Sequence, residues 1–255
     1  MAIQEFLDTH HVFTLAQFTQ EFPTGVTDRN LLARATQSGN VDIVRRGVYV
    51  SKVGQYAHAQ ADPFDVALAI ADDAIFCYMS ALQLHGVLHN LVNLTQFYTA
   101  HRIPPFSYAR LNYRPYRYPK PTPDTQSILT FSGYQYPVTT KEQTLIDCLV
   151  HPGLAGGPEN LLRSLSSFTY LDRNRLETQS QNLSRNTCAK LGWVLEAKQE
   201  EWLVSATFLE HLSKFVGGGP YYFYSSRPPK DDHWVNRWRL YLPYSEQEMI
   251  EWLNQ

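Results

Sequence analysis

The first fifty residues carry the pattern that most restricts how this chain can fold. Residues 14–50, TLAQFTQEFPTGVTDRNLLARATQSGNVDIVRRGVYV, predict a helix, a tight turn, a second helix and a short basic hairpin. Thr14 is a suitable N-cap, and Pro23 ends the first helix because proline disfavours the α region at the residue before it. The apolar residues of this helix recur at helical spacing: Leu15, Phe18 and Phe22.

The second helix is expected over residues 28–37, with Thr27 as its N-cap. On a helical wheel, where successive residues are rotated by about 100°, the apolar and polar residues of this helix lie on opposite sides. The apolar side consists of Leu31, Leu32 and Ala35. The polar side consists of Asn30, Arg34 and Gln37, with Arg29 beside them. Arginine pairs with guanine, and asparagine or glutamine with adenine, through paired hydrogen bonds in the major groove, so this side carries base-reading residue types.

A hairpin with a basic tip follows the second helix. Two short strands are expected at residues 41–43 and 48–50, and Arg45 and Arg46 lie near the tip between them, where they can hold phosphates. This order of elements predicts a winged helix-turn-helix that binds DNA. Trihelical modules also serve as dimerisation or scaffold units, but the coincidence of a polar face with a basic tip favours DNA.

The composition of the chain narrows the class of protein to which it can belong. The chain has 255 residues, 44% of them hydrophobic and 18% charged, which is typical of a globular protein with more than one domain. The net charge of −2 means that affinity for DNA must come from local patches. The sequence shows no secretion signal and no apolar run near the roughly 18 residues of a membrane span, so no membrane partner is expected. Cys77, Cys148 and Cys188 form no CxxC pair, which favours a reducing cytoplasm.

The remaining sequence predicts an α+β fold: the winged helix-turn-helix over residues 1–55 and a larger mixed α/β C-terminal domain over residues 63–255. A linker is expected at residues 51–62, with helices starting near Pro63 and Ser80. Strands are expected at residues 95–99, 127–131 and 134–138. Further helices are expected at residues 141–150, 158–168, 171–178, 185–197, 205–216 and 246–253.

Residues 74–123 contain no Asp or Glu. Their basic residues are Arg102, Arg110, Arg114, Arg117 and Lys120, interleaved with Tyr108, Tyr113, Tyr116 and Tyr118. Basic groups that alternate with aromatic rings can follow a phosphate backbone and stack on bases, so this stretch is a candidate surface for nucleic acid or a partner. An ordinary strand pair with tyrosines on one face and arginines on the other explains the pattern equally well. Residues 110–121, RLNYRPYRYPKP, are rich in proline and predict an exposed loop in part.

Three other motifs were considered for chemistry. His85 and His89 have the spacing of a zinc pair, but no acidic residue lies nearby in the sequence to complete the site. The glycine-rich residues 153–162 lack the Lys and Ser/Thr of a phosphate-binding loop. Asp147 and Cys148 lie in an apolar helix that favours packing over catalysis. We therefore expect no catalytic residues, metal or cofactor, and a protein that is not an enzyme.

Several motifs occur in an order that resembles a known family. GVYV (47–50) is followed by SALQLHGV (80–87), TTKEQTLIDCL (139–149), PGLAGGPENLL (152–162) and CAKLGWVLE (188–196). Over roughly residues 14–200, this order resembles the AbiEi-type antitoxins, the transcriptional regulators of type IV toxin–antitoxin systems in abortive infection and phage defence. Residues 201–255 and the Arg/Tyr stretch have no clear counterpart in the family.

The resemblance implies a function for each domain. The winged helix would repress its own operon by binding inverted repeats in double-stranded DNA, with Thr27, Arg29, Asn30, Arg34, Gln37, Arg45 and Arg46 as the DNA-binding residues. The C-terminal domain would counter a nucleotidyltransferase toxin without forming a stable complex with it. The alternative is a defence enzyme, a nuclease or a nucleotide-modifying protein, that the winged helix targets to DNA.

Overall fold

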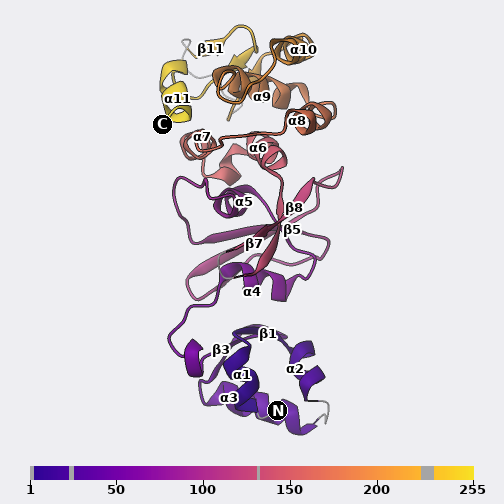
Figure 1. The fold of residues 1–255 in the computed structure, drawn as a ribbon, viewed down its shortest axis with the longest axis vertical. Coiled ribbons are helices and arrows are strands. Elements are labelled where there is room, and N and C mark those ends of the chain that lie inside the picture. The colour runs from indigo at the N-terminus through magenta and orange to yellow at the C-terminus, as the bar shows by residue number, and fades with distance from the viewer. Residues whose placement is uncertain (1–2, 23–25, 131–132, 225–232) are drawn as a thin grey trace. The chain divides into compact units, whose positions relative to one another are not determined.

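The fold was analysed in a computed structural model that describes residues 3–22, 26–130, 133–224 and 233–255. Side chains are described from residue 30 onward in the segment that begins at residue 26. The chain divides into two compact units. Unit 1 comprises Met1–Ala74 and Asn93–Arg117, and unit 2 comprises Ile75–Val92 and Tyr118–Gln255. Figure 1 gives the order of the elements along the chain.

The N-terminal part of unit 1 combines three helices with a small antiparallel sheet. Its elements are α1 (Ile3–Thr9), β1 (Val12–Thr14), α2 (Leu15–Glu21), α3 (Val26–Gln37), β2 (Val41–Arg45) and β3 (Val48–Ser51). The strand order is β1-β3-β2, so β3 pairs with both neighbours. Thr14 caps α2 as expected, and Gln17 completes a capping box with it.

Aromatic packing holds these elements together. Phe6 of α1 meets Phe13 and Phe18 edge-on, with ring centroids 5.2 and 5.4 Å away. Leu32 and Ala35 of α3 belong to the same buried cluster. Neither α1 nor β1 was expected, because both are short and β1 pairs with a strand far along the sequence. The N-cap expected at Thr27 is wrong, because α3 already begins at Val26.

Unit 1 continues with η1 (Gly54–Tyr56), α4 (Pro63–Ile70), β5 (Leu94–Thr99), β6 (Phe106–Tyr108) and β7 (Leu111–Arg117). Asp62 caps α4, which begins at Pro63, where the sequence predicts a helix start. β7 pairs with β5 in parallel and with β6 in antiparallel orientation. Of the proline-rich residues 110–121, residues 111–117 form the paired strand β7, and the loop expected in part of this stretch lies at residues 118–121.

The first part of unit 2 contains β4 (Ile75–Phe76), α5 (Tyr78–Leu84), β8 (Thr125–Leu129) and β9 (Gln135–Thr139). β9 pairs with β4 in parallel and with β8 in antiparallel orientation. The strand expected at residues 127–131 starts two residues earlier, and Phe131 lies outside the described residues.

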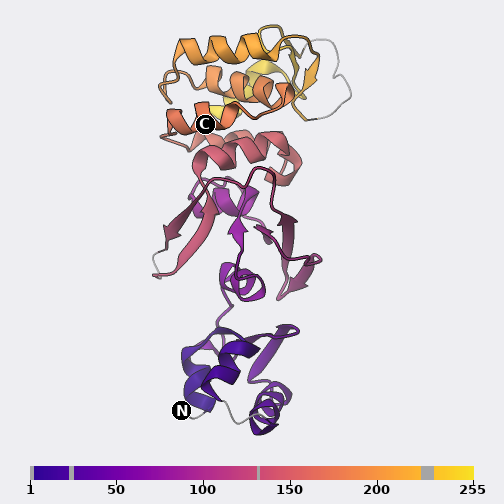
Figure 2. The same cartoon turned by 90° about the vertical axis from the view of Figure 1, so that its right-hand side faces the viewer.

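Helices dominate the rest of unit 2. They are α6 (Lys141–Val150), η2 (Pro152–Ala155), α7 (Pro158–Ser166), α8 (Arg173–Ser180), α9 (Arg185–Ala197), α10 (Ala206–Val216) and α11 (Glu246–Leu253). Side-chain caps begin most of the long helices, for example Thr140, Ser184, Ser205 and Ser245. α10 packs beside α9 (Figure 2).

A small three-stranded sheet packs on α9. It is formed by β10 (Tyr221–Tyr222), β12 (Leu240–Tyr241) and β11 (Trp234–Val235), in that order. The Trp238 indole donates a hydrogen bond to Glu196 of α9 over 2.6 Å. Its ring lies against Gly192, where an added Cβ would meet it at 2.0 Å. Only glycine allows this close approach of helix and indole.

The secondary structure confirms the expected α+β class, since helices and mixed strands occur in both units. The domain boundary expected near residues 55–63 falls inside unit 1 and stays a prediction. No helix in the described ranges is long and apolar enough to cross a membrane.

Candidate nucleic-acid interface

The two sides of α3 differ in burial as its sequence predicts. Leu32 and Ala35 are 4% and 8% exposed, and Leu31 is half-buried. Asn30, Arg34 and Gln37 are exposed. Thr27 and Arg29 belong to α3, but their side chains lie outside the described residues. The helix therefore presents three of the expected base-reading side chains to solvent while its apolar side is held in the core.

The C-terminal end of α3 is fixed by hydrogen bonds. The Asn40 N–H donates to the carbonyl of Ala35 over 2.9 Å, and the Gly39 N–H donates to that of Thr36 over 3.1 Å. Gly39 has a φ of +76°. Together these bonds form a Schellman motif, which requires the left-handed conformation that glycine adopts freely. This ending leads the chain directly from α3 into β2.

The two arginines at the hairpin tip have different environments. Arg46 is exposed. Arg45 is half-buried, and its guanidinium carbon lies 5.5 Å from the centre of the Phe106 ring. Its buried Nη1 has no hydrogen-bond partner among the described residues. Of the two predicted phosphate ligands, Arg46 is exposed to solvent, whereas Arg45 packs against β6 in a cation–π contact.

A polar contact accompanies the Arg45–Phe106 pair. The Tyr108 hydroxyl of β6 donates to the Asp42 carboxylate of β2 over 3.2 Å. Burial, and then the negative charge of Asp42, raise the pKa of the Tyr108 phenol. Lys52 forms an ion pair with the same carboxylate, at 3.7 Å. The Asp42 carboxylate therefore has both a hydrogen-bond donor and a cation as partners.

The Arg/Tyr stretch contains one fully buried tyrosine, half-buried tyrosines and exposed arginines. Tyr113 of β7 is fully buried and stacks on Phe106, with ring centroids 4.5 Å apart. The next residue, Arg114, is exposed. Tyr113 and Arg114 therefore point to opposite faces of β7, as neighbours in a strand do, whereas Arg114 and Tyr116 share a face, so tyrosines and arginines are not sorted onto separate faces.

The other basic residues of the stretch are exposed as well. Arg102, Arg110 and Lys120 are exposed, and Arg117 is exposed although its guanidinium donates to the Ala100 carbonyl. Tyr116 is half-buried and accepts a hydrogen bond from Gln96 over 3.3 Å. The exposed basic side chains are therefore the groups of this stretch that are accessible to a nucleic acid or a partner.

Among the motifs with possible chemistry, His85 and Cys148 lie in largely buried surroundings. The Nε2 atom of His85 lies 2.8 Å from the Thr139 carbonyl, and burial lowers the pKa of this histidine. His89 is exposed. Burial raises the pKa of the Cys148 thiol well above its usual value, with a further rise from Asp147, so the sulfur stays protonated and is a poor nucleophile.

A group of three potential metal ligands, Asp72, Asp73 and His101, was not expected from the sequence. The Asp73 carboxylate accepts hydrogen bonds from the Thr99 hydroxyl at 2.5 Å and the Ala100 N–H at 2.7 Å. These bonds explain the position of Asp73 without an ion. No local sequence pattern marks the group, because His101 is distant in the sequence from Asp72 and Asp73.

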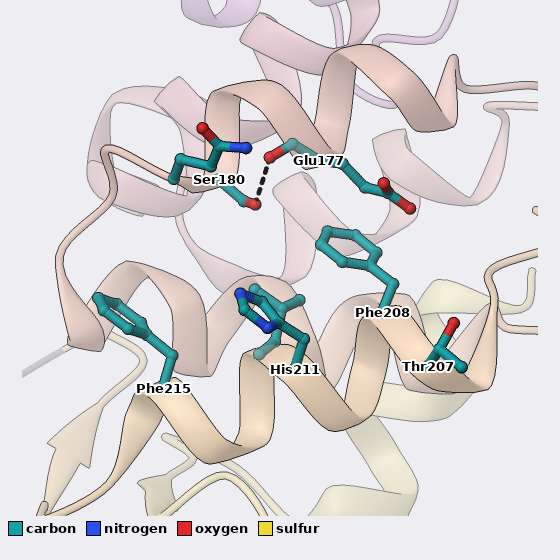
Figure 3. A pocket seen from close by; sticks show the side chains of 8 residues that line it. Glu177, Ser180, Thr207, Phe208, His211 and Phe215 are labelled. Carbon is teal, nitrogen blue, oxygen red and sulfur yellow. Dashed lines mark hydrogen bonds between the residues drawn. The ribbon is translucent and has the colours of Figure 1, made fainter.

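Unit 2 contains a pocket of about 470 Å³ between α8 and α10 (Figure 3). Side chains of α10 form one wall, and Glu177 and Ser180 of α8 contribute to the other. Sequence reasoning missed this pocket because each helix alone reads as an ordinary surface helix.

Comparisons with known proteins bear on the fold. No family model matches the chain, and no curated protein matches it. The crystal structure of the RV2827C protein from Mycobacterium tuberculosis is similar, with a TM-score of 0.69 and 13% sequence identity. The match covers 99% of this chain and 94% of that one. At this identity the similarity shows a shared α+β fold and nothing about function.

Proposed function

We propose that this protein binds double-stranded DNA through α3 and acts as an AbiEi-type antitoxin that represses its own operon. The observation that carries the proposal is the exposed row of Asn30, Arg34 and Gln37, opposite the buried Leu32 and Ala35. A helix that is rigidly held on one side and presents amide and guanidinium groups on the other suits readout of base edges in the major groove.

The elements around α3 support this proposal. The order α2, α3, β2, β3 is the order of a winged helix-turn-helix, and we assign that motif to residues 1–55. Arg46 lies exposed at the wing, where its guanidinium can bind a phosphate. Arg29 and Thr27 are assigned to the same interface from the sequence.

The antitoxin part of the proposal rests on the ordered motifs that resemble the AbiEi family. Four of these motifs, in residues 80–87, 139–149, 152–162 and 188–196, belong to unit 2. We propose that the C-terminal domain counters a nucleotidyltransferase toxin in the cytoplasm without forming a stable complex. Arg110 and Arg114 are exposed and remain candidates for contact with nucleic acid or a partner.

Two experiments test the two halves of the proposal. Fluorescence anisotropy of the chain with DNA from upstream of its own gene should show specific binding, at least about 1,000-fold tighter than to unrelated DNA of equal length. Equal affinity for both DNAs would contradict the repressor assignment. In cells that express a nucleotidyltransferase toxin of such a system, co-expression of this protein with its cognate toxin should restore growth, and continued growth arrest would contradict the antitoxin assignment.

A further inference from the structure

The pocket between α8 and α10 is a second candidate binding site, and it lies in unit 2 whereas α3 lies in unit 1. Its volume of about 470 Å³ falls within the range of roughly 300–1,000 Å³ that is usual for small-molecule sites. Nothing in the proposed DNA-binding function uses this pocket.

The wall formed by α10 is aromatic. Phe208, His211 and Phe215 follow one another at intervals of three and four residues, so they share one face of the helix. In Figure 3 all three rings project from α10 into the space toward α8. Leu212, which is 2% exposed, closes the base of the wall. A flat ring that enters this space meets aromatic surface along its faces.

Phe215 is the most exposed of these apolar side chains. It is 44% exposed, whereas Phe208 is 8% exposed. The guanidinium carbon of Arg185 lies 5.9 Å from the centre of the Phe215 ring. A cation–π contact of this kind helps to orient the ring at the edge of the pocket.

The wall formed by α8 adds a carboxylate. In Figure 3 the Glu177 side chain descends from α8 toward Phe208. No ion pair joins Glu177 to a cation within the described residues, and no Lys or Arg lines the pocket. Ser180 is already engaged, because its hydroxyl donates to the Glu177 carbonyl over 2.8 Å. The lining therefore combines aromatic faces with a negative charge.

We propose that this pocket binds a planar aromatic ring that carries N–H donors or a positive charge toward Glu177. Stacking against Phe208 and Phe215 would provide the apolar contact. Paired N–H groups would donate charge-assisted hydrogen bonds to the carboxylate. Aromatic amidines and nucleobases with an amino group share this chemistry, so the test includes both.

Binding is measured with the full-length chain by ligand-observed NMR and isothermal titration calorimetry. The probes are benzamidine, its anionic counterpart benzoate, and the nucleosides cytidine, adenosine and uridine. Benzamidine should bind at least about tenfold more tightly than benzoate, because the carboxylate attracts the first and repels the second.

Substitutions locate the binding. Glu177→Gln keeps the side-chain shape and should weaken benzamidine binding at least about fivefold while reducing the preference over benzoate. Phe215→Ala should weaken the binding of every probe that binds, by a factor similar to that of Glu177→Gln on benzamidine. Glu248→Gln, which changes an exposed carboxylate on α11, is the matched control and should leave every affinity unchanged. Circular dichroism verifies that each variant is folded.

The results of these measurements distinguish a nucleobase from an aromatic cation and can also overturn the proposal. A nucleoside that binds more tightly than benzamidine, with the same dependence on Glu177, identifies a nucleobase as the ligand type. Tighter benzamidine binding identifies an aromatic cation. Equal binding of benzamidine and benzoate, an unchanged affinity in Glu177→Gln, or no binding of any probe at millimolar concentration would overturn the proposal.

Discussion

The phenol of Tyr108 donates a hydrogen bond to the carboxylate of Asp42, over 3.2 Å, and so links β6 to β2 in unit 1. Next to this bond, Arg45 packs on Phe106. The β2–β3 hairpin, which we assign to DNA binding as the wing, is therefore held by one polar and one aromatic contact with β6.

Tyr108→Phe should lower the free energy of unfolding by about 0.5–1.5 kcal/mol, because one partly exposed side-chain hydrogen bond is lost. Chemical denaturation monitored by circular dichroism measures this change. Tyr170→Phe, at a tyrosine of unit 2 that is 66% exposed, is the matched control and should leave the stability unchanged. If Tyr108→Phe leaves stability unchanged, the contact with Asp42 contributes nothing to holding the wing.

Arg34→Ala should weaken specific DNA binding by about 1–3 kcal/mol, as expected for the loss of one base contact. Arg34 is exposed on the polar side of α3, so its removal should not disturb the core. Fluorescence anisotropy on the upstream DNA measures the affinity. Arg239→Ala, an exposed arginine of unit 2, is the control. An unchanged affinity and sequence preference in Arg34→Ala would exclude base readout by this residue.

The two wing arginines should respond differently to substitution. Arg46→Ala should reduce the slope of log affinity against log salt by about one unit, because one phosphate contact is lost. Arg45→Ala should change this slope less and lower stability by about 0.5–1 kcal/mol, because its cation–π contact with Phe106 is lost. Equal changes of slope in both variants would show that Arg45 also holds a phosphate.

Gly192→Ala should destabilise unit 2 by about 1–3 kcal/mol, the usual cost of overpacking a core. The added methyl group would lie 2.0 Å from the Trp238 ring, so the indole and its hydrogen bond to Glu196 must shift. Thermal denaturation measures the effect, and Gly218→Ala is the control because nothing lies within 4 Å of its added Cβ. A variant as stable as the unsubstituted protein would mean that Trp238 can move without cost.

Stability should depend on pH through Lys190. Burial lowers the pKa of this lysine from 10.5 to about 8, and its ammonium donates to the Leu149 carbonyl over 2.8 Å. Between pH 8 and pH 10.5 the unfolded chain binds more protons than the folded one at this group, so its contribution to stability rises with pH. Lys190→Met should remove that rise when the free energy of unfolding is measured across this range. The same pH dependence in both proteins would contradict the lowered pKa.

Local signals in the sequence predicted many of the elements. The bounds expected for α6, α9 and α11 are those observed, because a Thr or Ser cap starts each helix and an apolar stripe continues it. The two sides of α3 were predicted for the same reason: helical periodicity separates its apolar from its polar residues.

Features that depend on distant partners were not predicted. β1 was missed because it is short and pairs with β3. For β7 the sequence allowed both a strand and a loop, because Pro115 lies within it. The contact between Arg45 and Phe106 was not predicted, because it requires β6, which no local sequence pattern indicates. Binding of a phosphate by Arg45 stays a prediction. The pocket needs side chains from both α8 and α10, so neither helix alone reveals it.

The most direct test of the account is a comparison of sequence-specific DNA binding with and without the polar side of α3. The triple variant Asn30→Ala, Arg34→Ala, Gln37→Ala removes three exposed groups and leaves the buried Leu32 and Ala35 in place. We predict that, in anisotropy competition, it retains weak non-specific binding and loses the preference for the upstream DNA, which is at least about 1,000-fold in the unsubstituted protein. A folded triple variant that keeps its full preference for the upstream DNA would contradict the assignment of α3 as the recognition helix.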